Sequence, residues 1–260
     1  MEIIIKPTVA EAQQETAKIM RRQISRKPDS VLGLATGSTP IGVYALLAAM
    51  HEQGALDFSQ VSTFNLDEYV GLEAGHPCSY REFMREHLFG RVNIVPSRIH
   101  FPDGTAKDVP LHCADYEAAI VRAGGIDLQL LGIGREGHIG FNEPSSSLAS
   151  RTRIKTLTPQ TVQDNARFFG SADKVPRHVI TMGVGTIMDT RHCLMLATGG
   201  GKAEAVARMA EGAITADLPA SILQMHPACT LVVDEAAAAE LKRCEYYRWV
   251  YDNKPDWQRV

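Results

Sequence analysis

Residues 131–144 read Leu-Gly-Ile-Gly-Arg-Glu-Gly-His-Ile-Gly-Phe-Asn-Glu-Pro, and they follow an apolar run over residues 126–131. The run has the length and composition of a buried strand. Glycines are costly to order, so the glycines of this stretch indicate a backbone that approaches another group closely. Loops that follow buried strands carry the ligand sites of α/β proteins. The stretch therefore predicts an α/β fold with its chemistry in this loop.

The alternation of strands and helices continues on both sides of this stretch. Apolar runs predict strands at 3–5, 31–34, 61–66, 126–131, 179–182, 194–197 and 231–233. Helices are expected at about 8–26, which opens with the capping box of Thr8 and Glu11, and at about 40–53, 79–89, 113–122, 202–211 and 236–247. This order predicts a mostly parallel sheet with helices on both faces. We expect one three-layer, Rossmann-like α/β domain over residues 1–260, with a tail at about 246–260.

Composition and charge narrow the class of protein. Of the 260 residues, 45% are hydrophobic and 22% are charged, which is normal for a globular protein with a sizeable core. The formal net charge of −3 gives no reason to expect nucleic acid or a membrane surface as a partner. No apolar run is long enough to span a bilayer, and no signal peptide is apparent. Five scattered cysteines without a CxxC motif predict reduced thiols and a cytoplasmic location.

The turn 36–40, Thr-Gly-Ser-Thr-Pro, lies between the strand at 31–34 and a helix. Unpaired backbone N–H groups and the positive end of the helix dipole make such a turn an anion site. The hydroxyls of Ser38 and Thr39 add donors, although they are also ordinary helix caps. The turn is not a Walker loop, because no Gly-Lys-Ser/Thr follows.

Two adjacent carboxylates, Asp67 and Glu68, follow the strand at 61–66. Neighbouring side chains on an extended backbone point in opposite directions. One carboxylate can therefore enter a site while the other makes a structural contact. The alternative is a solvated acidic turn.

The stretch 131–144 matches the dinucleotide motif GxGxxG, but its context does not fit. The third glycine should lie in a helix, whereas another glycine and a proline follow, and the acidic residue expected further on is missing. What remains is His138 between Glu136 and Glu143, the arrangement of a general acid–base pair. A structural histidine and a metal site are the alternatives. We expect no metal, because no second histidine lies at helical or strand spacing.

Isolated basic residues form another group of candidates. Arg167 precedes two phenylalanines, and Lys202 follows three glycines at the start of a helix, a setting that binds anions. Each is alternatively a surface charge. Arg151, Arg153 and Lys155 alternate, so they share one face if the segment is extended. These three basic side chains are suited to binding an anion or an acidic partner. The alternative is that their charges prevent an exposed strand edge from pairing with other chains.

Four segments together resemble glucosamine-6-phosphate deaminases, in the glucosamine/galactosamine-6-phosphate isomerase family. They occur in family order at residues 35–40, 64–72, 137–144 and 147–158, and the similarity runs from about residue 1 to 245. The related 6-phosphogluconolactonases share the fold and a Gly-His turn but lack the continuation Ile-Gly-Phe-Asn-Glu-Pro. The lactonase is therefore the second candidate. A non-catalytic sugar-phosphate sensor is a third, although the strand expected near residue 2 leaves no room for a DNA-binding module before it.

The resemblance implies conversion of D-glucosamine 6-phosphate and water to D-fructose 6-phosphate and ammonia, without a cofactor. His138 matches the residue that opens the sugar ring, Glu136 and Glu143 match the carboxylates that orient it, and Asp67 matches the base. The phosphate site is matched by Gly37, Ser38, Thr39, Arg167 and Lys202. The family commonly has Asp where this chain has Glu136.

The resemblance also concerns assembly. Some members are hexamers activated by N-acetylglucosamine 6-phosphate between subunits, and others are monomers without activation. Ser146, Arg153 and Lys155 match the activator positions, which favours an allosteric homohexamer. The segment 246–249, Tyr-Tyr-Arg-Trp, does not align with the aromatic element that completes that site.

Overall fold

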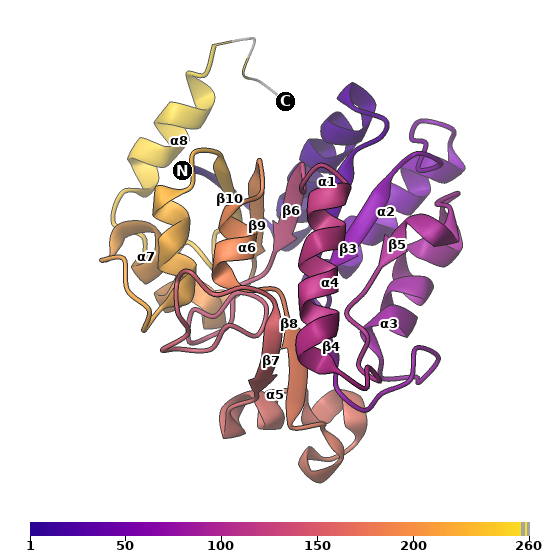
Figure 1. Ribbon diagram of the computed structural model, residues 1–260. Helices are drawn as coiled ribbons and strands as arrows, with labels where there is room; N and C mark the ends of the chain where they lie inside the picture. The colour runs from indigo at the N-terminus through magenta and orange to yellow at the C-terminus, as the bar shows by residue number, and fades with distance from the viewer. Residues whose placement is uncertain (256–257, 259–260) are drawn as a thin grey trace.

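The computed structural model describes residues 1–255 and 258. Within them, seven strands form one parallel sheet in the order β1-β10-β9-β6-β2-β3-β5 (Figure 1). Their bounds are β1 Glu2–Lys6, β2 Val31–Leu34, β3 Ser62–Asn65, β5 Ile99–His100, β6 Leu128–Leu131, β9 Cys193–Ala197 and β10 Cys229–Asp234. The α/β class and the mostly parallel sheet are confirmed.

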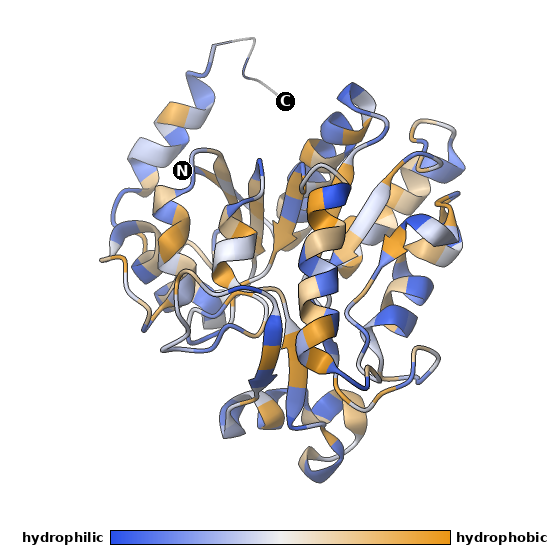
Figure 2. Ribbon diagram, in the orientation of Figure 1, coloured by the Kyte–Doolittle hydropathy of each residue, from blue (hydrophilic) through white to orange (hydrophobic). Residues whose placement is uncertain are grey.

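Helices cover both faces of this sheet. They are α1 Val9–Arg26, α2 Ile41–Glu52, α3 Tyr80–His87, α4 Val109–Arg122, α6 Val184–Met188, α7 Ala203–Glu211 and α8 Cys244–Asp252. The remaining α-helix, α5 Pro159–Phe169, packs on a separate cluster that includes Tyr69 and Val179. Successive strand residues enter opposite cores: Val31 belongs to the core cluster that includes residues of α4, α6 and α7, and Leu32 belongs to the one that includes residues of α1, α2 and α3. Figure 2 shows hydrophobic residues along the strands and a mixed pattern on α4. None of the described helices is long and apolar enough to cross a bilayer.

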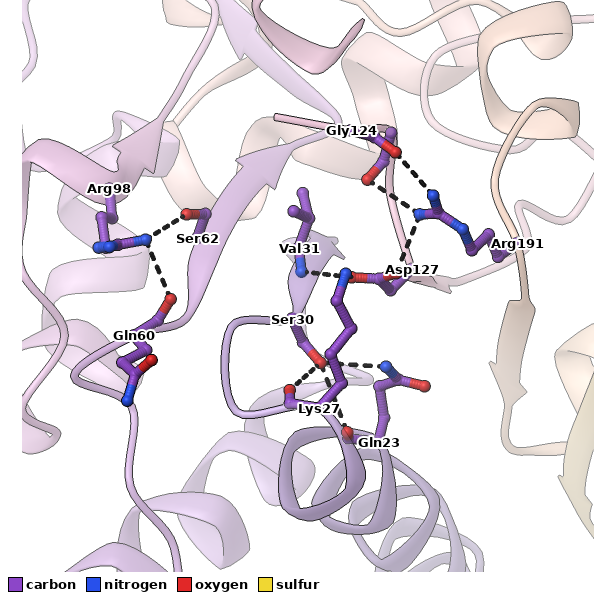
Figure 3. A network of polar contacts seen from close by, with 11 residues as sticks. Gln23, Lys27, Ser30, Val31, Gln60, Ser62, Arg98, Gly124, Asp127 and Arg191 are labelled. Atoms are coloured by element: carbon purple, nitrogen blue, oxygen red, sulfur yellow. Dashed lines mark hydrogen bonds and ion pairs between the residues drawn. The ribbon is translucent and has the colours of Figure 1, made fainter. Parts of the chain in front are cut away.

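A buried carboxylate fixes the amino-terminal edge of the sheet. Asp127, before β6, is 5% exposed and accepts hydrogen bonds from Lys27 Nζ at 2.6 Å and from the Val31 amide at 2.8 Å. Its other oxygen accepts from Arg191 Nη1 at 2.9 Å, as Figure 3 shows. These contacts join the end of α1, β2, β6 and the approach to β9. The edge opposite the predicted chemistry is thereby fixed by ion pairs.

A second, antiparallel sheet lies beyond one end of the large one and has the order β4-β8-β7 (Figure 1). It consists of β4 Asp67–Tyr69, β8 His178–Thr181 and β7 Arg153–Thr156. The strand expected at 179–182 is present, but it belongs to this antiparallel sheet and not to the parallel one, and the strand expected at 61–66 ends at Asn65. The chain changes sheets at Leu66, whose carbonyl accepts from the Met182 amide at 2.7 Å. Apolar strands of either sheet look alike in sequence.

Several helix bounds also differ from the expectations. α4 begins four residues earlier, because Asp108 caps it by accepting from the Leu111 amide at 3.0 Å. α5 and α6 were not predicted. Residues 236–243 form turns in place of a helix, since Asp234 Oδ1 accepts from the Ala237 amide at 3.0 Å. The expected tail 246–260 begins within α8, and its residues 256–257 and 259–260 lie outside the described part. The single domain stays a prediction.

Candidate active site

A cavity of about 610 Å³ opens at the carboxyl ends of β2, β3, β6 and β9. Its wall includes seven residues that were predicted from five separate places in the sequence: Gly37, Ser38, Thr39, Asp67, His138, Arg167 and Lys202. The carboxyl edge of parallel strands is where open α/β sheets bind ligands. The fold therefore places the predicted base, the predicted histidine and the predicted phosphate groups around one space.

Some of the groups that line the cavity are of the kinds that attract an anion, and we refer to them together as the anion-binding end. The turn after β2 passes through Gly37, whose φ of +103° is unfavourable for any residue with a side chain, and it leads into the amino terminus of α2. The turn lines the cavity together with Lys202, which follows β9, and Arg167, which lies on α5. Backbone amides at a helix amino terminus and cationic side chains both attract anions. Burial lowers the pKa of Lys202, and the neighbouring charges of Arg135 and Arg167 lower it further against the influence of Asp164.

Asp67 also lines the cavity and is 5% exposed. Burial raises the pKa of its carboxyl to about 8, and the adjacent Glu68 contributes to the rise. A carboxylate with this pKa is a stronger base than an exposed one. Asp67 therefore has the properties of a general base near neutral pH.

Glu68 points away from the cavity. Its carboxylate accepts hydrogen bonds from the backbone amides of Tyr69 at 2.9 Å, Tyr80 at 3.0 Å and Arg81 at 3.0 Å. Two of these amides belong to the first turn of α3, so Glu68 holds that helix against β4. The expectation of one functional and one structural carboxylate agrees with this geometry. The alternative of a solvated acidic turn is wrong, because both side chains are buried.

His138 stands between the cavity and two carboxylates. Its Nδ1 lies 3.3 Å from Glu143 Oε2 but is not aligned for a hydrogen bond, so the contact is electrostatic. Glu143 Oε1 accepts from Thr161 Oγ1 of α5 at 2.5 Å. Burial favours the neutral acid, but the interactions with His138 and then Thr161 outweigh it and lower the pKa of Glu143. Glu143 is thus held ionised beside the imidazole of His138.

Glu136 is exposed, and its carboxylate lies within 4.8 Å of the ligand atoms of His138 and Glu143. One histidine with two carboxylates is also a donor set for a metal ion. The expectation that no metal binds here stays a prediction.

The glycines at positions 134 and 137 shape the turn that positions His138. The Gly134 amide donates to the His138 carbonyl at 2.9 Å, and the Gly137 amide donates to the Gly134 carbonyl at 3.1 Å. A Cβ on Gly134 would lie 2.2 Å from Cε1 of the His138 ring, so only glycine leaves that ring in place. Gly137 has a φ of +80° in a turn and does not enter a helix, which agrees with the rejection of a dinucleotide motif.

The three predicted activator positions lie away from this cavity. Arg153 and Lys155 share one face of β7, and Arg153 Nη1 donates to Asn142 Oδ1 at 2.9 Å. Ser146 is 3% exposed, and its hydroxyl has no hydrogen-bond partner among the described residues. Arg151 does not join the stripe, because it precedes β7 and pairs with Glu117 and Asp189 at 2.5 and 2.6 Å.

The structure adds cavity residues that the sequence analysis did not select: Arg135, Asp164 and Tyr80. Arg135 lies within residues 131–144, and its position between Gly134 and Gly137 could have marked it as a candidate ligand-binding residue. Asp164 belongs to α5, which was not predicted. Tyr80 was read only as part of a helix.

Comparisons with known proteins identify the family of this chain. Residues 6–232 match the model of the family described as glucosamine-6-phosphate isomerases/6-phosphogluconolactonase. A glucosamine-6-phosphate deaminase of Arthrobacter sp. (strain FB24) is 57% identical over 258 residues, covering 99% of both chains. The solved structure of a monomeric glucosamine-6-phosphate deaminase has a TM-score of 0.91 at 45% identity, covering 92% of this chain and 100% of that one.

A 6-phosphogluconolactonase from Trypanosoma cruzi has a TM-score of 0.73 at 20% identity, covering 93% of this chain and 97% of that one. At this identity the likeness concerns the fold alone. The family model, by contrast, covers most of the chain, and the Arthrobacter relative is similar along almost its whole length. This chain belongs to the family of glucosamine-6-phosphate isomerases and 6-phosphogluconolactonases.

Proposed function

We propose that this protein is a glucosamine-6-phosphate deaminase that converts D-glucosamine 6-phosphate and water to D-fructose 6-phosphate and ammonia. The observation that carries the proposal is one cavity in which a buried carboxyl and a histidine–carboxylate pair face an anion-binding end. The 57% identity to the Arthrobacter deaminase supports it. The reaction joins an aldose–ketose isomerisation to hydrolysis of a C–N bond, and we place it in amino-sugar breakdown.

The first step is opening of the closed sugar ring. A proton must reach the ring oxygen while the C1 hydroxyl loses one. We assign this transfer to His138, because its ring lines the cavity and lies beside the ionised carboxylate of Glu143. Glu136 adds a second carboxylate near the imidazole. Thr161 keeps Glu143 in place, so α5 contributes to this step.

The second step moves a proton from C2 to C1 of the open sugar through an enolamine. We assign it to Asp67, whose raised pKa makes it a competent base. The ammonium group of the substrate at C2 favours the ionised carboxylate when the sugar binds. Water then adds to C2 and ammonia leaves, giving the ketose.

The anion-binding end holds the phosphate of the substrate. Amides at Gly37, Ser38 and Thr39, the dipole of α2, and the cations of Arg167 and Lys202 are the groups we assign to it. Fixing the phosphate at one end places C1 and C2 beside the acid–base groups, which replaces a random encounter with a positioned one.

Parallel assays separate this function from the lactonase. We expect ammonia release from glucosamine 6-phosphate and no hydrolysis of 6-phosphogluconolactone above background. Turnover of the lactone without ammonia release would overturn the proposal, and binding without either turnover would support a sensor. His138→Gln should slow ring opening severely, and Asp67→Asn should stop isomerisation. Near-normal turnover by either variant would refute the role assigned to that residue.

For assembly we propose a homohexamer with an activator site at Ser146, Arg153 and Lys155. The buried hydroxyl of Ser146 without a partner among the described residues, and two cations on one face of β7, are suited to a phosphorylated sugar. The 45% identical monomeric deaminase supports a monomer as the alternative. Light scattering measures the mass, and hyperbolic kinetics unaffected by N-acetylglucosamine 6-phosphate would refute activation. The five free cysteines support the cytoplasm as the proposed location.

A further inference from the structure

Arg135 occupies the tip of the turn that positions His138. The turn is closed by the hydrogen bond of the Gly137 amide to the Gly134 carbonyl at 3.1 Å. Arg135 and Glu136 are its two central residues, and both are exposed. Arg135 lines the same cavity as Asp67 and His138. Its guanidinium is therefore available to a ligand in that cavity.

The charge of Arg135 acts on the anion-binding end. It contributes more to the lowered pKa of Lys202 than Arg167 does, although burial is the largest cause. The charge of Arg135 therefore acts on Lys202, as does the charge of Arg167. All three cations line the cavity.

Among the described residues, the positive charges of Arg135, Arg167 and Lys202 are not neutralised by ion pairs with carboxylates. Within residues 1–255 and 258, none of them forms an ion pair with a carboxylate. Asp164 is the acidic neighbour of Lys202, and its Oδ1 accepts a hydrogen bond from Gln160 Nε2 at 2.9 Å. Three like charges repel each other at close range, and that repulsion is relieved when a polyvalent anion enters.

We propose that Arg135 binds the substrate phosphate as a third cation beside Lys202 and Arg167, an assignment that rests on the proposed function. A sugar phosphate is mostly a dianion above its second pKa near 6, with three terminal oxygens to satisfy. The planar guanidinium donates two parallel hydrogen bonds to such a group, whereas Lys202 acts as a compact charge. Arg135 thereby links the phosphate to the turn that carries Glu136.

The test compares Arg135→Gln and Arg135→Lys with wild type. Arg122→Gln is the matched control, because Arg122 is an exposed arginine of α4 that does not line the cavity. Hydrogen bonds to charged groups are each strong enough that losing one changes affinity by roughly tenfold or more. We expect Arg135→Gln to raise KM for glucosamine 6-phosphate about tenfold and to leave kcat within about twofold. The lysine variant should lie between it and wild type.

Competitive inhibition by inorganic phosphate provides a second readout. Its inhibition constant should rise by the same factor as KM in Arg135→Gln and stay unchanged in Arg122→Gln. An unchanged KM and inhibition constant would overturn the proposal, as would equal effects in the control. A fall in kcat with a shifted pH profile at constant KM would also overturn it, since Arg135 would then act on Glu136 and His138. If wild type releases no ammonia, the proposed function fails, and calorimetric binding of inorganic phosphate still decides the role of Arg135.

Discussion

Replacing Asp67 by Asn should stabilise the folded protein while abolishing its deaminase activity. Burial raises the pKa of Asp67 to about 8 from an ordinary value of 3.8. No charged partner among the described residues offsets that burial, because the other contribution, from Glu68, raises the pKa too. Asn has nearly the same shape and cannot ionise, so it removes the cost of a buried charge.

The sign and size of the effect follow from proton linkage. Below pH 4 the carboxyl is protonated in both states and contributes no difference. Between pH 4 and 8 the unfolded chain ionises and the folded chain does not, so wild type loses stability as the pH rises. One pKa unit corresponds to 1.36 kcal/mol, which gives a loss of about 4 kcal/mol at pH 7 and about 6 kcal/mol above pH 9. Asp67→Asn should recover much of that free energy of unfolding.

Urea unfolding of wild type and Asp67→Asn at pH 5, 7 and 9 measures this difference. The advantage of the variant should grow with pH. Asp127→Asn is the control with the opposite expected sign. Asp127 is equally buried at 5% exposure but is paired with Lys27 and Arg191, so weakening these charge-assisted hydrogen bonds should destabilise the protein by about 1–3 kcal/mol. A gain for Asp67→Asn that is absent at pH 7, or constant from pH 5 to 9, would refute the reasoning.

Three further predictions concern the histidine and its carboxylates. Gly134→Ala should lower kcat about 100-fold with an unchanged far-ultraviolet circular dichroism spectrum, because the new Cβ displaces the His138 ring; a normal kcat would contradict this. Glu136→Asp should retain activity within a few fold, because it shortens an exposed side chain by one carbon–carbon bond, and steady-state kinetics will show whether the longer residue matters. Thr161→Val removes the 2.5 Å hydrogen bond that helps to hold down the pKa of Glu143, so the acidic limb of the kcat/KM profile should move to higher pH and kcat should fall about fivefold. An unmoved limb would show that this hydrogen bond does not control Glu143.

Local sequence patterns were sufficient for much of the fold. β2 occupies Val31–Leu34 as expected, and the capping box of Thr8 and Glu11 opens α1, where the Glu11 amide donates to Thr8 Oγ1 at 3.2 Å. Such features depend on residues a few positions apart, so they can be recognised in a single sequence. The bounds of α8 were missed because the helical pattern at 236–243 competes with a turn capped by Asp234.

The choice of chemistry also came from the sequence, because residue types limit what a site can do. A histidine beside two carboxylates, as at His138, is typical of acid–base catalysis. A glycine-containing turn before a helix, as before α2, is typical of anion binding. Their assembly around one cavity follows from the rule that parallel strands present their carboxyl ends to the same edge.

Only the tertiary structure decided the environments that set reactivity. Asp67 owes its raised pKa to a second sheet, in which β4 pairs with β8 more than 100 residues later in the chain. The lowered pKa of Glu143 depends partly on the hydrogen bond from Thr161 of α5. The fold also brings the charge of Arg135 to bear on Lys202, which led to the proposed role of Arg135 in phosphate binding. Burial and long-range electrostatics depend on which distant segments pack together. The sequence therefore determined which groups this protein has for catalysis, and the packing determined how acidic or basic each one is.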